Sequence, residues 1–377
     1  MKIGISEMYS YLRMTGMAVL AAGLIGCGGG GDNDGPNIPT ASNAAITPPP
    51  TTALTIATGV EAAPTNQTIA AAAFQAVDGG GLLTTGNSSG VFSVNATPTV
   101  TETTRLTIAE IVRRHAEKIK DHKGSASVTG AQIVNTIPCA VSGTYTIVFD
   151  DVSGNASEIF VNCNDGGVIS HGTISSTGVS ATFTLGDTVG SPYEISLAAT
   201  ITIDLSITST FTNPVEILVF QGAFTFNVAF SGTMEDDGFG GVQPGPGLIT
   251  IAIAGASLLV SDGVNSEQLS NFALTVVYND VTGESTVDSD FTYASSADAI
   301  NGTVTVNTTT PIHYASGAFH PDAGVIEITS SVSPGKIKVT ILGASTGVRV
   351  DVYANAVDDT SLTATYTLTW AEFEALI

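Results

Sequence analysis

The sequence contains no lysine or arginine between Gly124 and Gly335, although acidic residues occur throughout this stretch. The whole chain has 11 basic and 34 acidic residues, which gives a formal net charge of −23. Because nucleic-acid binding needs a basic surface, this charge excludes DNA and RNA as partners. The acidic side chains of the stretch must therefore face water, accept hydrogen bonds or meet a cation from elsewhere.

Aromatic residues and long apolar runs are also scarce. Only 7% of the residues are aromatic, and Trp370 is the single tryptophan. Barrels of the outer membrane carry aromatic girdles and need strands of only about 9–11 residues, whereas the alternating runs of this chain are longer. Beyond the N-terminus no apolar run is long enough for a transmembrane helix. The sequence therefore favours a domain outside the bilayer over a membrane barrel.

The first 27 residues have the pattern of a bacterial lipoprotein export signal. Lys2 and Arg13 supply positive charge, and Met14–Ile25 is an apolar stretch too short to span a bilayer. This stretch runs into LIGC, which ends at Cys27 and is similar to the lipobox of bacterial lipoproteins. The resemblance implies cleavage before Cys27, diacylglycerol on its sulfur and a further acyl chain on its amino group. The alternatives are an ordinary signal peptide that contains a cysteine and a translation start at Met8.

Acylation of Cys27 would make membrane lipid a partner of the protein, because each buried methylene contributes about 0.8 kcal/mol. Gly28 follows the cysteine, and the sorting rule of enteric bacteria retains proteins with aspartate at that position in the inner membrane. The sequence thus predicts a lipid anchor in the outer membrane, on its periplasmic or cell-surface face.

Two cysteines remain once Cys27 is lipidated. Exported proteins fold in an oxidising compartment, so we expect Cys139 and Cys163 to form a disulfide, the alternative being two free, buried thiols. Between them, apolar residues alternate on both sides of the turn-rich DDVSGNAS, which predicts a hairpin that brings the cysteines together. Such a closed loop would stabilise the fold by about 3 kcal/mol.

Composition divides the chain into four segments. These are a signal peptide over 1–26, a disordered Gly- and Pro-rich tether over 27–65, a helical segment over 66–124 and an antiparallel β domain over 125–377. A free coil of the tether's length would extend roughly 35 Å on average. Two helices are expected, over Asn66–Gly80 and Thr107–Gly124, and a capping box between Thr107 and Glu110 marks the second.

From about Ser142 onward apolar and polar residues alternate with a period of two. In YEISLAATITIDLSIT (Tyr193–Thr208) every odd-numbered residue is apolar. A strand of this length spans roughly 50 Å, and its apolar face must be covered throughout. About thirteen such strands follow one another, separated by turn signals. Because large sheets curl, we predict an all-β fold, a large curved antiparallel meander (open barrel or half-barrel) with one or two N-terminal helices packed against it.

Motifs for catalysis or metal binding are weak. GNSSG (Gly86–Gly90) and GASTG (Gly343–Gly347) fit the G-x-S-x-G pattern, but neither lies between a strand and a helix, as a nucleophile elbow must. His313 and His320 lack the partners of a zinc site, and the acidic turns match no complete calcium loop. His115 is expected to be a hydrogen-bonded residue of the second helix. No catalytic residue, metal or other cofactor is therefore predicted.

From Cys139 onward the chain resembles a group of uncharacterised proteobacterial lipoproteins with a low-complexity tether and a long β-meander. The likeness is carried by GTYTIVFDD, EIFVNCNDGGVISHGTI, GVIEITSS, KIKVTILG, GVRVDVYAN and YTLTW. It implies a location in the cell envelope and a β fold. No activity and no site residue carries over from it.

These observations together predict an outer-membrane-anchored lipoprotein that acts as a non-enzymatic scaffold or binds a protein partner. The alternative is a carrier that holds an apolar ligand or lipid in the curved sheet, which would need an unfilled cavity. A third hypothesis, a secreted hydrolase with two catalytic carboxylates, finds no residue pair that supports it.

Overall fold

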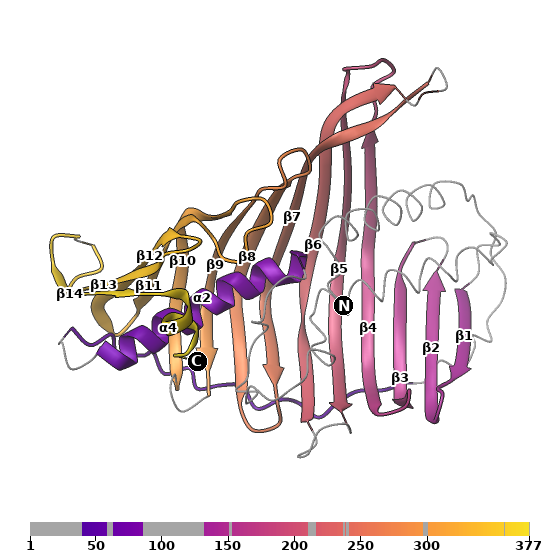
Figure 1. The fold of residues 1–377 in the computed structure, drawn as a ribbon. Helices are drawn as coiled ribbons and strands as arrows, with labels where there is room; N and C mark the ends of the chain where they lie inside the picture. The colour runs from indigo at the N-terminus through magenta and orange to yellow at the C-terminus, as the bar shows by residue number, and fades with distance from the viewer. Residues whose placement is uncertain are drawn as a thin grey trace.

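One antiparallel sheet of 14 strands, ordered β1 to β14 as in the sequence, forms the body of the protein (Figure 1). The computed structural model describes residues 40–58, 63–85, 132–150, 153–209, 216–236, 238, 241–296, 301–357 and 359–376. The sheet is open, because β1 and β14 form its two ends and do not pair with each other. The predicted all-β curved meander with a packed N-terminal helix is confirmed.

The elements have the following bounds: α2 (Ala63–Thr85), β1 (Gln132–Pro138), β2 (Ser142–Asp150), β3 (Ala156–Asn164), β4 (Val168–Thr184), β5 (Pro192–Ser209), β6 (Glu216–Asp236), β7 (Val242–Ser261), β8 (Ser266–Asn279), β9 (Ser285–Ser295), β10 (Gly302–Tyr314), β11 (Ala323–Ser330), β12 (Ser333–Gly343), β13 (Gly347–Tyr353), β14 (Leu362–Leu368) and α4 (Trp370–Glu374).

Strand β5 shows how the period of two builds the sheet. Its apolar residues Ile201, Ile203 and Leu205 are at most 4% exposed. The register with β6 runs without a break from Pro192, opposite Thr233, to Ser209, opposite Glu216. A slip by one residue would turn the whole apolar set toward water, so the burial of this face fixes the register.

A bulge in β7 corrects the phase of the next strand. The odd-numbered residues Ile249–Ile253 are buried before it, and the even-numbered Leu258 and Val260 are buried after it. The pairing with β6 shifts so that Ala256 is the extra residue. Such a bulge bends the strand and keeps its apolar residues on one face. The sequence indicated this change of phase near Gly255.

Helix α2 lies on the concave face of the sheet, against β8, β9 and β11–β13 (Figure 1). Its alanine-rich side and Phe74 belong to the same buried core as the strands. The ring centroid of Phe74 is 5.5 Å from that of Trp370 and 5.6 Å from that of Phe373 in α4. This helix was expected over Asn66–Gly80 and is longer at both ends; the second expected helix, Thr107–Gly124, lies outside the described residues.

Candidate functional site

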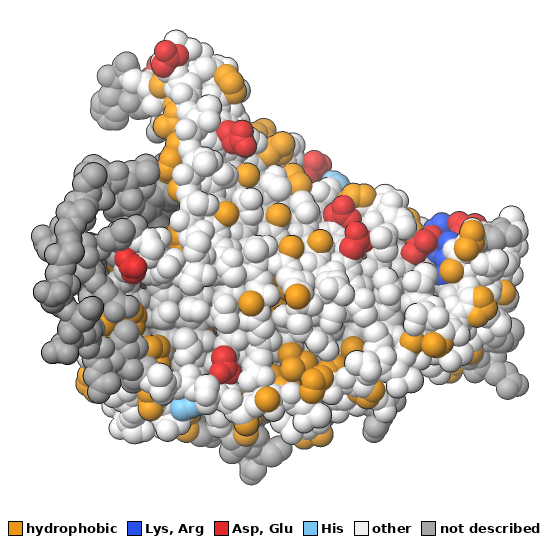
Figure 2. Space-filling view, turned by 180° about the vertical axis from the view of Figure 1, so that it is seen from behind, with side chains coloured by type: hydrophobic (Ala, Val, Ile, Leu, Met, Phe, Trp, Pro, Cys, Tyr) orange, Lys and Arg blue, Asp and Glu red, His pale blue; other side chains and the backbone are white. Residues whose placement is uncertain are grey.

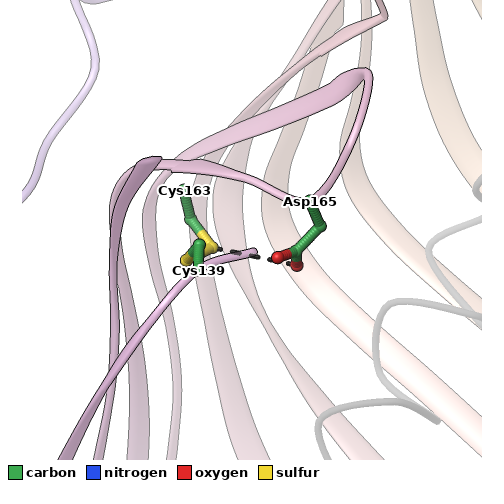
Figure 3. Close-up of side chains that lie close together, drawn as sticks. All are labelled: Cys139, Cys163 and Asp165. Atoms are coloured by element: carbon green, nitrogen blue, oxygen red, sulfur yellow. Dashed lines mark hydrogen bonds between the residues drawn. A yellow bond between two sulfur atoms is a disulfide. The ribbon is translucent and has the colours of Figure 1, made fainter. Parts of the chain in front are cut away.

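The predicted disulfide is present. Cys139, just after β1, and Cys163, in β3, are bonded with their Cα atoms 5.4 Å apart (Figure 3). The carboxylate of Asp165 lies beside them, and one possible ligand atom from each of the three residues falls within 4.8 Å of the others. Metal binding by cysteine needs a free thiolate, so the oxidised pair serves as a cross-link and not as a metal site. Cys27, the predicted lipidation site, lies outside the described residues.

The G-x-S-x-G motifs do not form a nucleophile elbow in the described residues. GASTG (Gly343–Gly347) is the turn between β12 and β13, and its Ser345 is exposed there. A nucleophile elbow requires a strand followed by a helix, which this hairpin turn does not provide. GNSSG (Gly86–Gly90) and His115 lie outside the described residues.

The two histidines singled out in the sequence each have their own carboxylate. His313 Nδ1 lies 2.5 Å from Asp322 Oδ1 on the outer face of the sheet. His320 stacks on Trp370, with ring centroids 4.7 Å apart, and its Nδ1 is 3.5 Å from Glu374 Oε1. These contacts fasten the loop between β10 and β11 to the strand before it and to α4, which is a structural role.

Acidic turn residues bind the backbone of their own turns. Asp150 Oδ1 accepts a hydrogen bond from the backbone N–H of Ser153 at 3.1 Å, and Asp236 Oδ1 accepts one from that of Gly238 at 2.7 Å. Such Asx turns use the carboxylate to satisfy the turn itself. Asp150 and Asp236 each stabilise the turn in which they stand.

All three basic residues of the described chain gather on the outer face of β12 and β13, at one end of the molecule (Figure 2). Asp359, from the loop before β14, pairs with both Lys336 and Lys338. Hydrogen bonds from these two lysines lower the pKa of Asp359. Burial lowers the pKa of Lys336, but its hydrogen bonds to Asp359 and Glu327 outweigh that effect and raise it. This ion network holds the loop on the sheet.

Two buried tyrosine–glutamate pairs were missed in the sequence. Tyr145 Oη donates to Glu158 Oε2 at 2.8 Å, and Tyr293 Oη donates to Glu267 Oε1 at 2.9 Å. Tyr145 faces Phe160, which is two residues from Glu158 in β3. Tyr293 faces Leu269, which is two residues from Glu267 in β8. Burial raises the pKa of Glu267 to about 7, against the opposing effect of the Tyr293 hydrogen bond. The sequence held one signal for this burial: Glu267 lies two residues from the buried Leu269 and therefore on the same face of β8.

The segment before α2 docks on the sheet, and Asn43 is its main contact. The Nδ2 atom of Asn43 donates to the carbonyl of His171 at 3.1 Å and to Asp204 Oδ1 at 3.2 Å. The backbone N–H of Asn43 donates to Asp204 Oδ2 at 3.1 Å. Asp204 lies on the polar, outer face of β5, so this segment starts outside the curved sheet.

Further contacts carry the same segment around the lower edge of the sheet (Figure 1). The backbone N–H of Ile46 donates to Gln221 Oε1 at 3.0 Å, and that of Leu54 donates to the carbonyl of Thr303 at 2.9 Å. Ile56 is then 2% exposed within the core. We call residues 40–58 the strap, because they lead from the outer face to the concave face, where α2 begins.

The strap corrects the predicted course of the chain. Residues 27–65 were expected to form a free tether, yet the part from 40 to 58 lies against the sheet. The reason is that its hydrogen-bond partners on the sheet lie 128 to 277 residues away in the sequence, where no local pattern reveals them. Residues 27–39 of the expected tether lie outside the described residues.

Fold and site together define an open antiparallel meander. A disulfide cross-links it near β1, and the N-terminal strap crosses its outer face. Comparison of the chain with family models, with curated proteins and with solved structures gives no match. The resemblance to envelope lipoproteins therefore stays a prediction. No helix in the described residues is long and apolar enough to cross a membrane.

Proposed function

We propose that this chain is a lipoprotein anchored in the outer membrane through Cys27, with a non-enzymatic role as a scaffold or partner-binding protein. The strap is the observation that carries this proposal. It attaches the N-terminal side of the domain to the outer face of the sheet at Asn43, so that force on the lipid anchor would be transmitted to β5.

The strap also shortens the distance between domain and membrane. About 13 residues separate Cys27 from Thr40, and a fully extended chain of this length reaches at most about 45 Å. As a flexible coil it would extend about 20 Å on average, compared with roughly 35 Å for the longer tether. The sheet is then held close to the membrane surface.

The filled interior supports a scaffold over a carrier of apolar ligands. Large side chains on the concave face are buried, among them Phe220 at 1% and Phe224 at 3% exposure. They form one continuous core with α2 and α4. A carrier would keep such a face free for its ligand.

Membrane fractionation of Cys27→Ser tests the anchor. We expect the unaltered protein in the outer-membrane fraction, soluble only in detergent, and the variant in the soluble periplasmic fraction. Cys139→Ser is the matched control and should keep the membrane location. Equal fractionation of the Cys27→Ser variant and the unaltered protein would contradict the anchor, and a lipid that co-purifies in native mass spectrometry after delipidation would favour the carrier.

A further inference from the structure

The last strand of the sheet has an open edge. Among the described residues β14 pairs with β13 alone, and in Figure 1 it forms the end of the meander. An open edge offers unpaired backbone N–H and C=O groups to another strand. Natural proteins usually protect such edges with lysine, proline or an inward-pointing charge. The seven residues Leu362–Leu368 contain none of these.

Another edge of the same sheet is protected. Strands β6 and β7 extend beyond β8, whose pairing with β7 begins at Leu248. The stretch of β7 before that point pairs with β6 and not with β8, and it contains Pro244 and Pro246. Proline cannot donate a backbone hydrogen bond, so strand addition is blocked there. Within one molecule, the open edge of β7 therefore carries protecting prolines and the open edge of β14 carries none.

The sequence of β14 is complementary to itself. If two copies pair antiparallel around a two-fold axis at Thr365, Thr365 lies opposite itself and Ala364 lies opposite Tyr366 of the other copy. The register with β13 puts Thr365 opposite Asp351 and Thr367 opposite Arg349, on the outer face, and a bulge makes Thr363 the extra residue of β14. Apolar residues then meet apolar residues and hydroxyls meet hydroxyls, which favours cross-strand pairing.

Charge also favours this edge for contact between two copies. A chain with a net charge of −23 repels a second copy over most of its surface. Near β14, however, Lys336, Lys338 and Arg349 balance the neighbouring acids through ion pairs. Since β14 itself carries no charge, two copies can approach there without bringing unpaired like charges together.

We propose that β14 is a dimer interface, through which two copies of this chain join edge to edge into one continuous antiparallel sheet. Pairing around a two-fold axis closes after two copies, because each edge is used once. A seven-residue edge is a small interface, so the dimer is in exchange with monomer, and confinement of both copies to one membrane would favour it. This proposal does not depend on the lipid anchor.

Cysteine cross-linking of the full chain, purified in detergent, tests the register. Under mild oxidation Thr365→Cys should give a disulfide-linked dimer that a reductant cleaves, because residue 365 of one copy faces residue 365 of the other at the two-fold axis. Thr202→Cys is the matched control, because Thr202 is exposed on the interior strand β5. Equal rates of cross-linking for the two variants would overturn the proposal.

Sedimentation of Thr365→Lys provides the second readout. Two lysines facing each other at the axis should raise the dimer Kd at least about tenfold, with circular dichroism unchanged from the unaltered protein. Monomers at every concentration of the unaltered chain would refute the interface. So would a dimer that survives the Thr365→Lys substitution, open-ended filaments, or a strand of a different protein on β14.

Discussion

Tyr293 holds the carboxyl group of Glu267 inside the core with a hydrogen bond of 2.9 Å, and each side chain comes from one of two neighbouring strands, β9 and β8. Burial is the largest influence on this carboxyl and raises its pKa from 4.5 to about 7, and Asp262 adds to the rise. The folded protein therefore binds a proton at Glu267 more tightly than the unfolded chain does.

Glu267→Gln is expected to change the pH dependence of stability. Below about pH 4.5 the carboxyl group of Glu267 is protonated in both the folded and the unfolded protein. The folded protein loses this proton only as the pH rises through about 7. The resulting penalty amounts to about 3 kcal/mol above that pH. The variant keeps an acceptor for Tyr293, so its free energy of unfolding should exceed that of the unaltered protein at pH 8 and match it near pH 4.

Urea unfolding at both pH values measures this difference. Glu194→Gln is the control, because Glu194 is exposed on β5 and should give no comparable change. An identical pH profile for the unaltered protein and Glu267→Gln would show that Glu267 does not carry the perturbed pKa.

Asn43→Ala is expected to loosen the strap. It removes the side-chain hydrogen bonds to Asp204 and His171, at a cost of about 1–2 kcal/mol. Hydrogen exchange of residues 40–46 should become about tenfold faster, while the strands keep their protection. Asn307→Ala, at an exposed position of β10, is the control. Unchanged exchange of the strap in Asn43→Ala would rule out Asn43 as its main attachment.

Loss of the disulfide is expected to weaken one end of the sheet. The bond between Cys139 and Cys163 closes a loop with a sequence separation of 24. Cys163→Ser should therefore lower the free energy of unfolding by about 3 kcal/mol in the chain-entropy model. Hydrogen exchange should locate the change in β1–β3, and uniform loss of protection over all strands would contradict a local role.

Phe373→Ala is expected to detach α4 from the core. Phe373 is 1% exposed and packs against Phe74 of α2, so its truncation should cost about 3–5 kcal/mol. Phe319→Ala is the control, because Phe319 is 71% exposed and its truncation should change stability by about 0.5 kcal/mol or less. Thermal unfolding compares the two variants, and equal losses would argue against the packing of α4 on α2.

The sequence predicted those parts of the fold that depend on local pattern. Alternation in β5 and the phase change near Gly255 follow from residues within one strand, and both are confirmed. The bond between Cys139 and Cys163 was predictable because the alternation around DDVSGNAS indicated a hairpin and the expected export indicated an oxidising compartment. Strand β1 (Gln132–Pro138) was missed, since it is short and lies before the region in which the alternation becomes regular.

The parts that could not be predicted depend on contacts between distant residues. Asn43 stands in a stretch rich in proline and threonine, and nothing near it indicates Asp204 as its partner. The phase of Glu267 matches that of the buried Leu269, but its hydrogen-bond partner Tyr293 lies on the next strand. The open edge of β14 could be described only after the strand order showed that β1 does not close the sheet against it.

The mass of the mature N-terminus tests the proposed anchoring most directly. Mass spectrometry of the intact protein, purified in detergent from its native membrane, should give a chain that begins at Cys27 and carries diacylglycerol and a further acyl chain. A chain that begins elsewhere, or one that begins at Cys27 without any lipid, would contradict the account.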